Sequence, residues 1–221
     1  MITENPGGNS VSVLLGNGNG TFQAKQDYAV GTQPYSVFSI DVNQDSKIDM
    51  ITANAGGNSV SVLLGNGNGT FQAKQDYAVG TGPTCVFSID VNQDSKIDMI
   101  TANPGGNSVS VLLGNGNGTF QVKQDYAVGT QPTSVFSIDV NQDSKIDMIT
   151  ANYADNSVSV LLGNGNGTFQ AKQDYAVGTE PTSVSSIDVN QDSKIDLITA
   201  NYAANSVEAK NRNIKTTDNF S

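Results

Sequence analysis

Hydrophobic residues along the chain are gathered in short runs that Gly, Asn, Asp or Pro interrupt. Ser10–Leu15 alternates polar and apolar residues before a Leu pair, Phe22–Val30 and Pro34–Val42 combine aromatic and β-branched residues, and Ile48–Ala53 reads Ile-Asp-Met-Ile-Thr-Ala. Short runs of this composition, bounded by turn-forming residues, are typical of β-strands. No stretch of ten residues or more carries the apolar stripe of a helix, so a helical repeat protein is excluded.

The same runs return every 49 residues. The string Asn-Ser-Val-Ser-Val-Leu-Leu-Gly begins at Asn9, Asn58, Asn107 and Asn156, and a remnant begins at Asn205. The four near-identical repeats span 9–57, 58–106, 107–155 and 156–204, and the first two differ at four of 49 positions. Four short strands per unit of this length is the spacing of a β-propeller blade. We therefore predict an all-β propeller of four-stranded antiparallel blades.

The two ends of the chain are complementary in phase. Met1–Asn5 matches Met50–Asn54, so the chain begins at the second strand of a blade, and it ends with first and second strands at 181–202. We expect the N-terminal strands to pair with the C-terminal ones, which closes a ring of four blades without a free edge. The alternatives are an eight-bladed ring of two chains and head-to-tail linkage.

The propeller is predicted to cover residues 1–207. The periodicity fails from Glu208, and residues 208–221 form a divergent polar segment that we expect to be disordered.

The amino-acid composition excludes several kinds of catalytic site, metal site and partner. The 221 residues include 21 acidic and 11 basic side chains, one Cys and no His. Without His there is no imidazole base and no His-ligated metal, so any metal must be held by oxygen. The formal net charge of −10 argues against a nucleic-acid partner. No run approaches the roughly 18 apolar residues of a membrane helix, so no membrane span is expected.

An oxygen-rich loop follows the first strand of each unit. In the first it reads Asp41-Val42-Asn43-Gln44-Asp45-Ser46-Lys47-Ile48-Asp49, with oxygen-bearing side chains at loop positions 1, 3, 5 and 9. Calcium takes six to eight oxygen ligands, and the backbone carbonyl at position 7 supplies one more. An EF-hand is excluded because position 12 is Thr52 rather than Glu. The alternative is a polar turn in which Asp and Asn side chains bond to their own backbone.

The prediction is up to four Ca²⁺ ions, one per blade. The predicted ligands, loop by loop, are Asp41, Asn43, Asp45, Lys47 and Asp49; Asp90, Asn92, Asp94, Lys96 and Asp98; Asp139, Asn141, Asp143, Lys145 and Asp147; and Asp188, Asn190, Asp192, Lys194 and Asp196, each Lys through its carbonyl. The loops contain twelve of the 21 acidic residues, and four bound ions would change the formal charge from −10 to −2.

The loop and the residues after it resemble the FG-GAP or VCBS repeat, the calcium-loop blade also found in integrin α-subunit propellers. The resemblance is carried by the D-x-N-x-D-x-x-x-D pattern of Asp41–Asp49, by Met50–Asn54 and by Asn58–Phe71, and it covers residues 1 to about 207. It implies a β-propeller, calcium at each loop between first and second strands, and an extracellular or cell-surface role in binding or adhesion.

Two departures from the family pattern predict weak calcium binding. Ser46 and its equivalents stand at position 6 where the family has Gly, and a non-Gly residue is strained in a left-handed conformation. Position 3 is Asn43 rather than Asp, which leaves three carboxylates per loop. We expect dissociation constants on the order of 10⁻⁴ to 10⁻³ M.

A second polar loop joins the third and fourth strands. Gly16-Asn17-Gly18-Asn19-Gly20-Thr21 has no following helix and no Lys-Ser/Thr pair, so it is not a phosphate loop. We expect a hairpin turn that uses the positive φ angles of Asn-Gly. The loop also contains an N-glycosylation sequon. The candidate acceptors are Asn19, Asn68, Asn117 and Asn166.

Differences between the copies cluster at two sites. They lie before the first strand, at Gln33/Gly82/Gln131/Glu180 and Tyr35/Thr84/Thr133/Thr182, and between the second and third strands, at Ala55/Pro104/Tyr153/Tyr202 and Gly57/Gly106/Asp155/Ala204. In an up-and-down blade these loops share one face, and the calcium and Asn-Gly loops share the other. The differences are either drift at tolerant loops or a ligand-contact face.

These features predict a non-catalytic, extracellular calcium-binding propeller that binds a protein or glycan at the variable loops. No constellation of residues breaks the fourfold repetition, so we do not expect an enzyme. The alternatives are a propeller lectin and a structural module that self-associates into oligomers or extracellular fibres.

Overall fold

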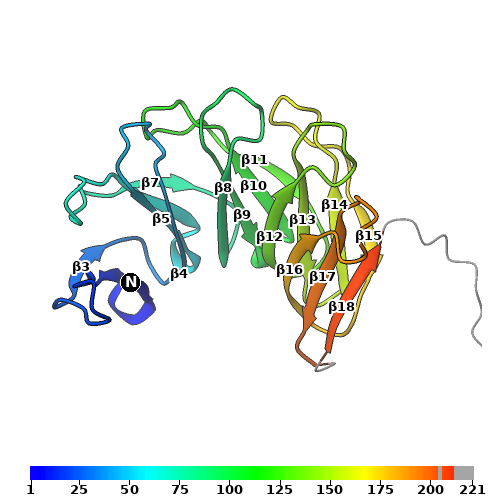
Figure 1. The fold of residues 1–221 in the computed structure, drawn as a ribbon, viewed down its shortest axis with the longest axis horizontal. Helices are drawn as coiled ribbons and strands as arrows, with labels where there is room; N and C mark the ends of the chain where they lie inside the picture. Colours follow the sequence, from blue (N-terminus) through cyan, green and yellow to red (C-terminus); the bar gives the residue numbers. More distant parts are fainter. Residues whose placement is uncertain (204–205, 212–221) are drawn as a thin grey trace, which may run out of the picture.

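The chain forms five antiparallel β-sheets that follow one another along an open arc (Figure 1). The computed structural model describes residues 1–203 and 206–211. We name the sheets blades 1 to 5. Blade 1 contains β1 (Ile2–Asn5), β2 (Ser10–Val13) and β3 (Gln26–Ala29). Blade 2 contains β4 (Pro34–Ile40), β5 (Asp49–Asn54), β6 (Ser59–Leu63) and β7 (Gln75–Ala78).

The remaining blades repeat this order. Blade 3 contains β8 (Cys85–Ile89), β9 (Asp98–Asn103), β10 (Ser108–Leu112) and β11 (Gln124–Ala127); blade 4 contains β12 (Pro132–Ile138), β13 (Asp147–Asn152), β14 (Ser157–Leu161) and β15 (Gln173–Ala176); blade 5 contains β16 (Pro181–Ile187), β17 (Asp196–Asn201) and β18 (Ser206–Asn211). Short 3-10 turns, η1 (Pro6–Gly8), η2 (Ala55–Gly57) and η3 (Pro104–Gly106), join the second and third strands of blades 1 to 3.

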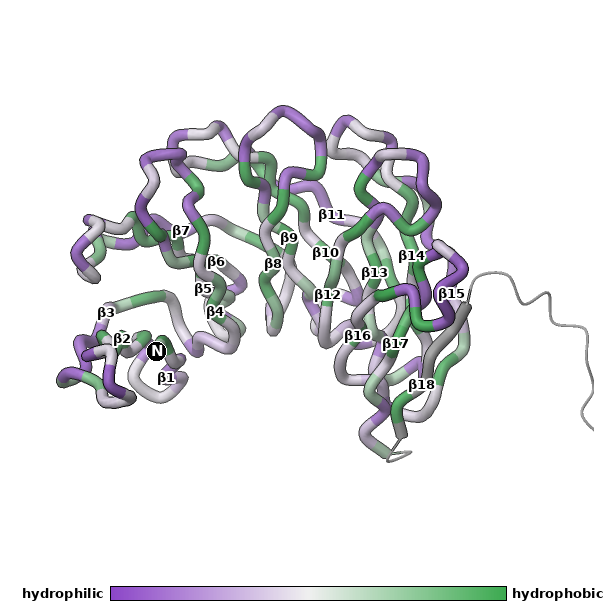
Figure 2. Tube along the Cα trace, viewed as in Figure 1, coloured by the Kyte–Doolittle hydropathy of each residue, from purple (hydrophilic) through white to green (hydrophobic). Residues whose placement is uncertain are grey.

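Burial changes across each blade. Every residue of the second strand β5 is buried, because β4 and β6 pair with its two edges and neighbouring blades cover its faces. The fourth strand β7 is mostly exposed. Apolar residues accordingly run along the inner strands, and polar residues fill the loops and the outer rim (Figure 2).

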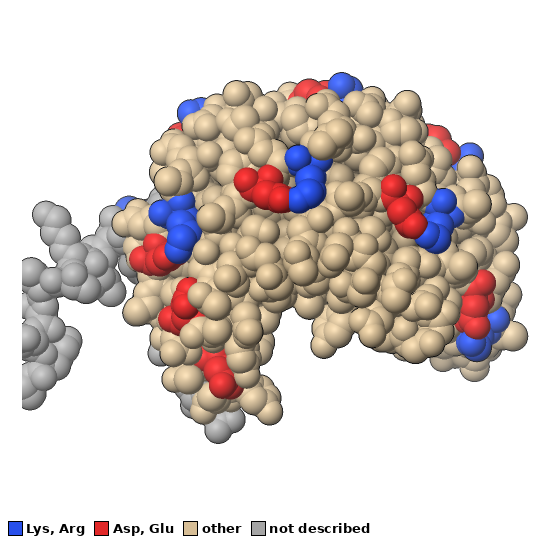
Figure 3. Space-filling view, turned by 180° about the vertical axis from the view of Figure 1, so that it is seen from behind, with Lys and Arg blue, Asp and Glu red and all other residues tan. Residues whose placement is uncertain are grey.

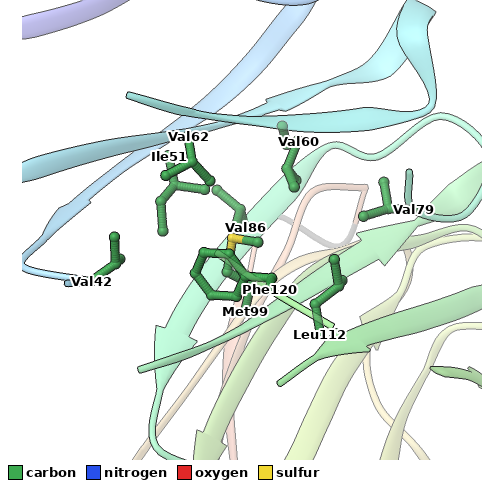
Figure 4. Close-up of a cluster of buried hydrophobic side chains, with 10 residues drawn as sticks. Val42, Ile51, Val60, Val62, Val79, Val86, Met99, Leu112 and Phe120 are labelled. Atoms are coloured by element: carbon green, nitrogen blue, oxygen red, sulfur yellow. The ribbon is translucent and has the colours of Figure 1, made fainter. Parts of the chain in front are cut away.

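The hydrophobic core lies between blades rather than within them. One cluster joins Val42, Ile51, Val60, Val62 and Val79 of blade 2 to residues of blade 3 (Figure 4). The blade 3 contribution consists of Val86, Met99, Leu112 and Phe120. Each blade therefore has one face for its predecessor and a different face for its successor.

A buried polar network, which the sequence did not predict, crosses the second, third and fourth strands of blade 2. The Thr52 hydroxyl donates to Asn54 Oδ1 at 3.2 Å, Asn54 Nδ2 donates to Ser61 Oγ at 3.0 Å, and Ser61 Oγ donates to Asp76 at 2.6 Å. Blades 3 and 4 repeat it. Because each of these four side chains has a partner within the network, it stabilises the register of these strands.

The predicted strand pattern is confirmed, and the chain begins at a second strand as expected. The predicted closure of four blades is wrong for this structure. The N-terminal strands and the C-terminal strands form separate sheets, at opposite ends of the arc (Figure 1). β18 pairs with β17, with Val207 opposite Ala200, and so takes the place expected for Ser10–Leu15. A strand that follows after a short connection closes a smaller loop than the distant N-terminus does.

β18 also extends four residues into the segment expected to be a disordered tail, as far as Asn211. The rest of that segment, residues 212–221, lies outside the described residues. In the described part of the chain no helix is long and apolar enough to cross a membrane.

Candidate calcium loops

Four loops with the same sequence connect the first and second strands of blades 2 to 5. The loop of blade 2 leaves β4 at Asp41 and ends at Asp49, the first residue of β5. The Asp41 carboxylate accepts hydrogen bonds from the backbone N–H groups of Asp45 at 3.2 Å and Ser46 at 2.8 Å. The same pair of bonds recurs in the other three loops. Position 1 therefore bends the loop around its own carboxylate.

The side chains at positions 3 and 5 also accept hydrogen bonds from backbone N–H groups later in the loop. Asn43 Oδ1 accepts from the Asp45 N–H at 3.2 Å, and Asp45 Oδ1 accepts from the Lys47 N–H at 2.9 Å. The Lys47 ammonium also lies 3.1 Å from Asp45 Oδ2. Although partial burial opposes ionisation, these contacts hold the pKa of the Asp45 carboxyl below its usual range.

Asp49, at position 9, has a different role from the other carboxylates. Its side chain is fully buried and accepts from the N–H groups of Val42 at 2.9 Å and Gly65 at 2.7 Å. A Cβ on Gly65 would lie 2.1 Å from the Ile48 carbonyl oxygen, so only glycine permits this approach. Asp49 thus joins the loop to the start of the Asn-Gly hairpin.

Burial raises the pKa of the position 9 carboxyls in blades 2 to 4, and the nearby loop carboxylates add to the rise. The direction is the same for Asp49 and Asp147, and the pKa of Asp98 rises to about 6. A buried, negatively charged group of this kind is stabilised by a nearby cation.

The backbone bends sharply at loop positions 4 and 6. Gln44 has a φ of 62° and Ser46 a φ of 65°, and all four loops show the same pair of left-handed residues. The strain expected at position 6 is therefore present. A left-handed conformation costs a non-glycine residue on the order of 1 kcal/mol.

The loop of blade 5 lacks one contact that the others have. Val189 donates to Asp196 Oδ2 at 3.0 Å, but among the described residues no donor contacts the buried Asp196 Oδ1. In blades 2 to 4 the corresponding oxygen is bonded by the glycine of the hairpin. In blade 5 the residue at the position of this glycine is Arg212, which lies outside the described residues.

The donor set of these loops fits calcium in its chemistry. Each loop offers three carboxylates and an amide oxygen, and an oxygen that accepts one N–H retains a second lone pair. The side chains as they stand are turned toward backbone N–H groups. In the described part of the chain no group of three or more acidic, His or Cys side chains is gathered as a metal cluster. The polar turn is thus formed, and metal binding stays a prediction.

The Asn-Gly loops form the expected hairpins beside the oxygen-rich loops. Asn17 N–H donates to the Thr21 carbonyl at 2.9 Å, and Gly18 and Gly20 have φ angles of 79° and 87°. The hydroxyl of Thr21 donates to Asn19 Oδ1 at 2.7 Å. The four sequon asparagines, Asn19, Asn68, Asn117 and Asn166, are exposed.

The two variable loops lie side by side, as predicted for one face of a blade. Tyr153 N–H donates to the Gln131 carbonyl at 3.0 Å, and Tyr202 N–H donates to the Glu180 carbonyl at 2.9 Å. Across blades 4 and 5, the Tyr153 side chain hydrogen-bonds Glu180, which raises the pKa of its phenol. Tyr202 is 70% exposed. Positions that differ between the copies therefore place two tyrosines and a carboxylate close together in the variable loops of blades 4 and 5.

Lysine side chains at the outer strands lie next to aspartates. Lys25, Lys74, Lys123 and Lys172 each contact an Asp two residues later, on the fourth strand of a blade. Adjacent acidic and basic side chains recur along the face seen in Figure 3.

A family model described as FG-GAP-like repeat matches residues 41–101, 90–150 and 139–199. No curated protein sequence matches the chain. Among solved structures, a putative 6-phosphogluconolactonase from Bacteroides fragilis is 18% identical, with a TM-score of 0.72 over 94% of this chain and 62% of that one. A putative 6-phosphogluconolactonase from Bacteroides uniformis is 16% identical, with a TM-score of 0.69 over 96% and 64%.

A catalytically inactive virginiamycin B lyase from Staphylococcus aureus is 12% identical, with a TM-score of 0.59 over 96% of this chain and 66% of that one. The chain thus spans less than two thirds of each of these structures. Their likeness shows the fold. It also corrects the expectation that the chain is not an enzyme, because enzymes share this architecture and the fold does not separate the two classes.

Proposed function

The chain belongs to the FG-GAP-like repeat family, and on that premise we propose that it is an extracellular calcium-binding propeller that holds a protein or glycan partner at its variable-loop face. The observation that carries the proposal is the repetition of one oxygen-rich loop with the same hydrogen bonds in four blades. Up to four ions would bind, one in each loop.

The residues that would hold each ion are those at positions 1, 3, 5 and 9, with the carbonyl of position 7. The ion would supply positive charge to three carboxylates that otherwise repel one another. Position 9 would link it to the sheet, since Asp49 is bonded to Val42 and Gly65. Ligands that bind only the folded chain stabilise it.

The expected affinity favours a location outside the cell. Three carboxylates and a strained position 6 suit dissociation constants on the order of 10⁻⁴ to 10⁻³ M, the range of extracellular modules. Exposed sequon asparagines on the same side are compatible with that location.

The partner would bind where Tyr153, Glu180 and Tyr202 meet. Tyrosine rings offer apolar faces for a sugar ring or a peptide, and a carboxylate accepts hydrogen bonds from hydroxyl or amide groups. The two tyrosines occur only in blades 4 and 5, because the first two copies have Ala55 and Pro104 at this position.

Calorimetric titration with calcium tests the metal sites. We expect up to four ions per chain and a higher melting temperature, and Asp45→Ala is expected to remove one ion while leaving the others. Asp155→Ala is the matched control, since it removes an acidic residue outside the loops where another copy has Ala204. If millimolar calcium gave neither heat nor a melting shift, the loops would be ordinary turns.

A glycan array, run beside a pull-down from extracellular proteins, tests the partner face. Binding should fall at least tenfold in Tyr153→Ala and Tyr202→Ala, and should be unchanged in Val122→Ala, whose side chain is 94% exposed and belongs to neither variable loop. Equal loss in all three variants would contradict the assignment of the face.

A further inference from the structure

Apolar side chains are exposed at the two ends of the arc, at positions that are buried in the other blades. Val207 is 72% exposed, whereas its equivalents Val60, Val109 and Val158 have no exposure. Val189 is 49% exposed, whereas its equivalents in blades 2 to 4 are at most 7% exposed. These residues belong to the successor-facing side of blade 5.

In blade 1, the exposed apolar residues are at positions that contact the preceding blade elsewhere in the molecule. Met1 is 65% exposed, although Met50 and Met99 at the same position have none. Phe22 is 49% exposed, but Phe120 and Phe169 are each 8% exposed. We call Ile187, Val189, Ile198 and Val207 the last face, and Met1, Leu14 and Phe22 the first face.

The interior of the molecule shows what each face binds. Between blades 2 and 3, Met99, Leu112 and Phe120 pack against the valines and isoleucine that correspond to the last face (Figure 4). Met99, Leu112 and Phe120 are the equivalents of Met1, Leu14 and Phe22. Blades 3 and 4 form the same contact, with Met148, Leu161 and Phe169.

The two faces are therefore complementary halves of an interface that the chain already builds between its own blades. Among the described residues nothing covers either face, and the arc holds its ends apart (Figure 3). We propose that the last face of one copy binds the first face of a second copy, head to tail.

The contact is smaller than an internal one. Blade 1 has no first strand, so it lacks the loop whose serine carbonyl accepts from a glutamine of the preceding blade, as Ser95 accepts from Gln44. Association consequently depends on the apolar residues. Because the interface joins two different patches, repeated use of it produces a closed ring or an open filament.

Sedimentation velocity of the full chain over a wide range of concentrations tests this proposal. Wild type should form dimers or longer assemblies. Val189→Asp, with Val207→Asp as a second variant of the same face, and Phe22→Asp on the other face should each weaken association at least tenfold. Val122→Asp is the control, since Val122 is 94% exposed and belongs to neither face. Circular dichroism and melting curves verify that each variant is folded.

A mixing experiment tests the head-to-tail geometry. Val189→Asp retains the first face and Phe22→Asp retains the last face, so the two variants together should form a heterodimer with one intact interface, although neither assembles alone. A mixture that stays monomeric would overturn the proposal. So would a wild-type chain that is monomeric at every concentration, or a Val122→Asp variant that dissociates as readily as the others.

Discussion

The loops of blade 3 and blade 5 have the same nine residues but different surroundings. In blade 3 both oxygens of Asp98 accept backbone N–H groups, from Val91 at 2.9 Å and Gly114 at 2.7 Å. In blade 5 only one oxygen of Asp196 has a donor among the described residues. The internal winding of the loops is the same. The loop sequence therefore determines its own bend, whereas the hairpin of the third and fourth strands determines how the loop is anchored.

The largest expected difference between the two loops is the loss of stability when the position 9 carboxylate is removed. Asp98→Ala leaves two buried N–H groups without an acceptor and should lower the free energy of unfolding in chelator by about 3 kcal/mol. Asp196→Ala leaves one such group and should cost about half as much. Urea unfolding followed by circular dichroism measures both, and equal losses would contradict the difference in anchoring.

The loop of blade 3 should also make the stability of the chain depend on pH. The pKa of Asp98 is raised from 3.8 to about 6, so the proton binds the folded chain more tightly than the unfolded chain. Stability from this group is full below pH 3.8 and is lost as the pH rises through 6. In chelator, the chain should therefore gain on the order of 1 kcal/mol between pH 7 and pH 5.

Melting curves at several pH values measure this gain, and Asp98→Ala should reduce it. Carboxyls with lowered pKa values, such as Asp94, act in the opposite direction but only at lower pH. A steady loss of stability from pH 7 to pH 5 would therefore count against a raised pKa at position 9.

Position 6 should show no difference between the two loops. Ser95 and Ser193 both have a φ of 65°. Replacing either by Gly removes the same strain and should stabilise the chain by about 1 kcal/mol. Differential scanning calorimetry checks this, and a gain confined to one loop would mean that the surroundings impose the strain.

Position 5 should give the smallest effect. Lys96 lies 3.2 Å from Asp94 and Lys194 lies 3.7 Å from Asp192, at partly exposed sites. Such ion pairs contribute little, so Asp94→Ala and Asp192→Ala should each change stability in chelator by less than about 0.5 kcal/mol. Larger losses in urea unfolding would show that position 5 supports the fold as well as the proposed metal site.

The local features were predictable because they depend on residues close in sequence. Alternating runs predicted the strands, and the positions of Asp and Asn predicted a bent, oxygen-rich loop. The anchoring of Asp49 was not predictable, since its donor Gly65 lies sixteen residues later and contacts it only in the folded blade. The open arc was missed for a similar reason. The pairing of β18 with β17 competes with the N-terminal strands, and only the three-dimensional arrangement shows which partner is taken.

The near identity of the blades has a consequence for how the chain folds. β6 and β10 share the sequence Ser-Val-Ser-Val-Leu, so neither strand carries a signal that distinguishes its own neighbours from those of the next blade. The short connections between successive strands decide instead, because they keep the correct partner at the highest local concentration. Folding should then proceed blade by blade, and crowded refolding should trap exchanged strands that slow dilution avoids.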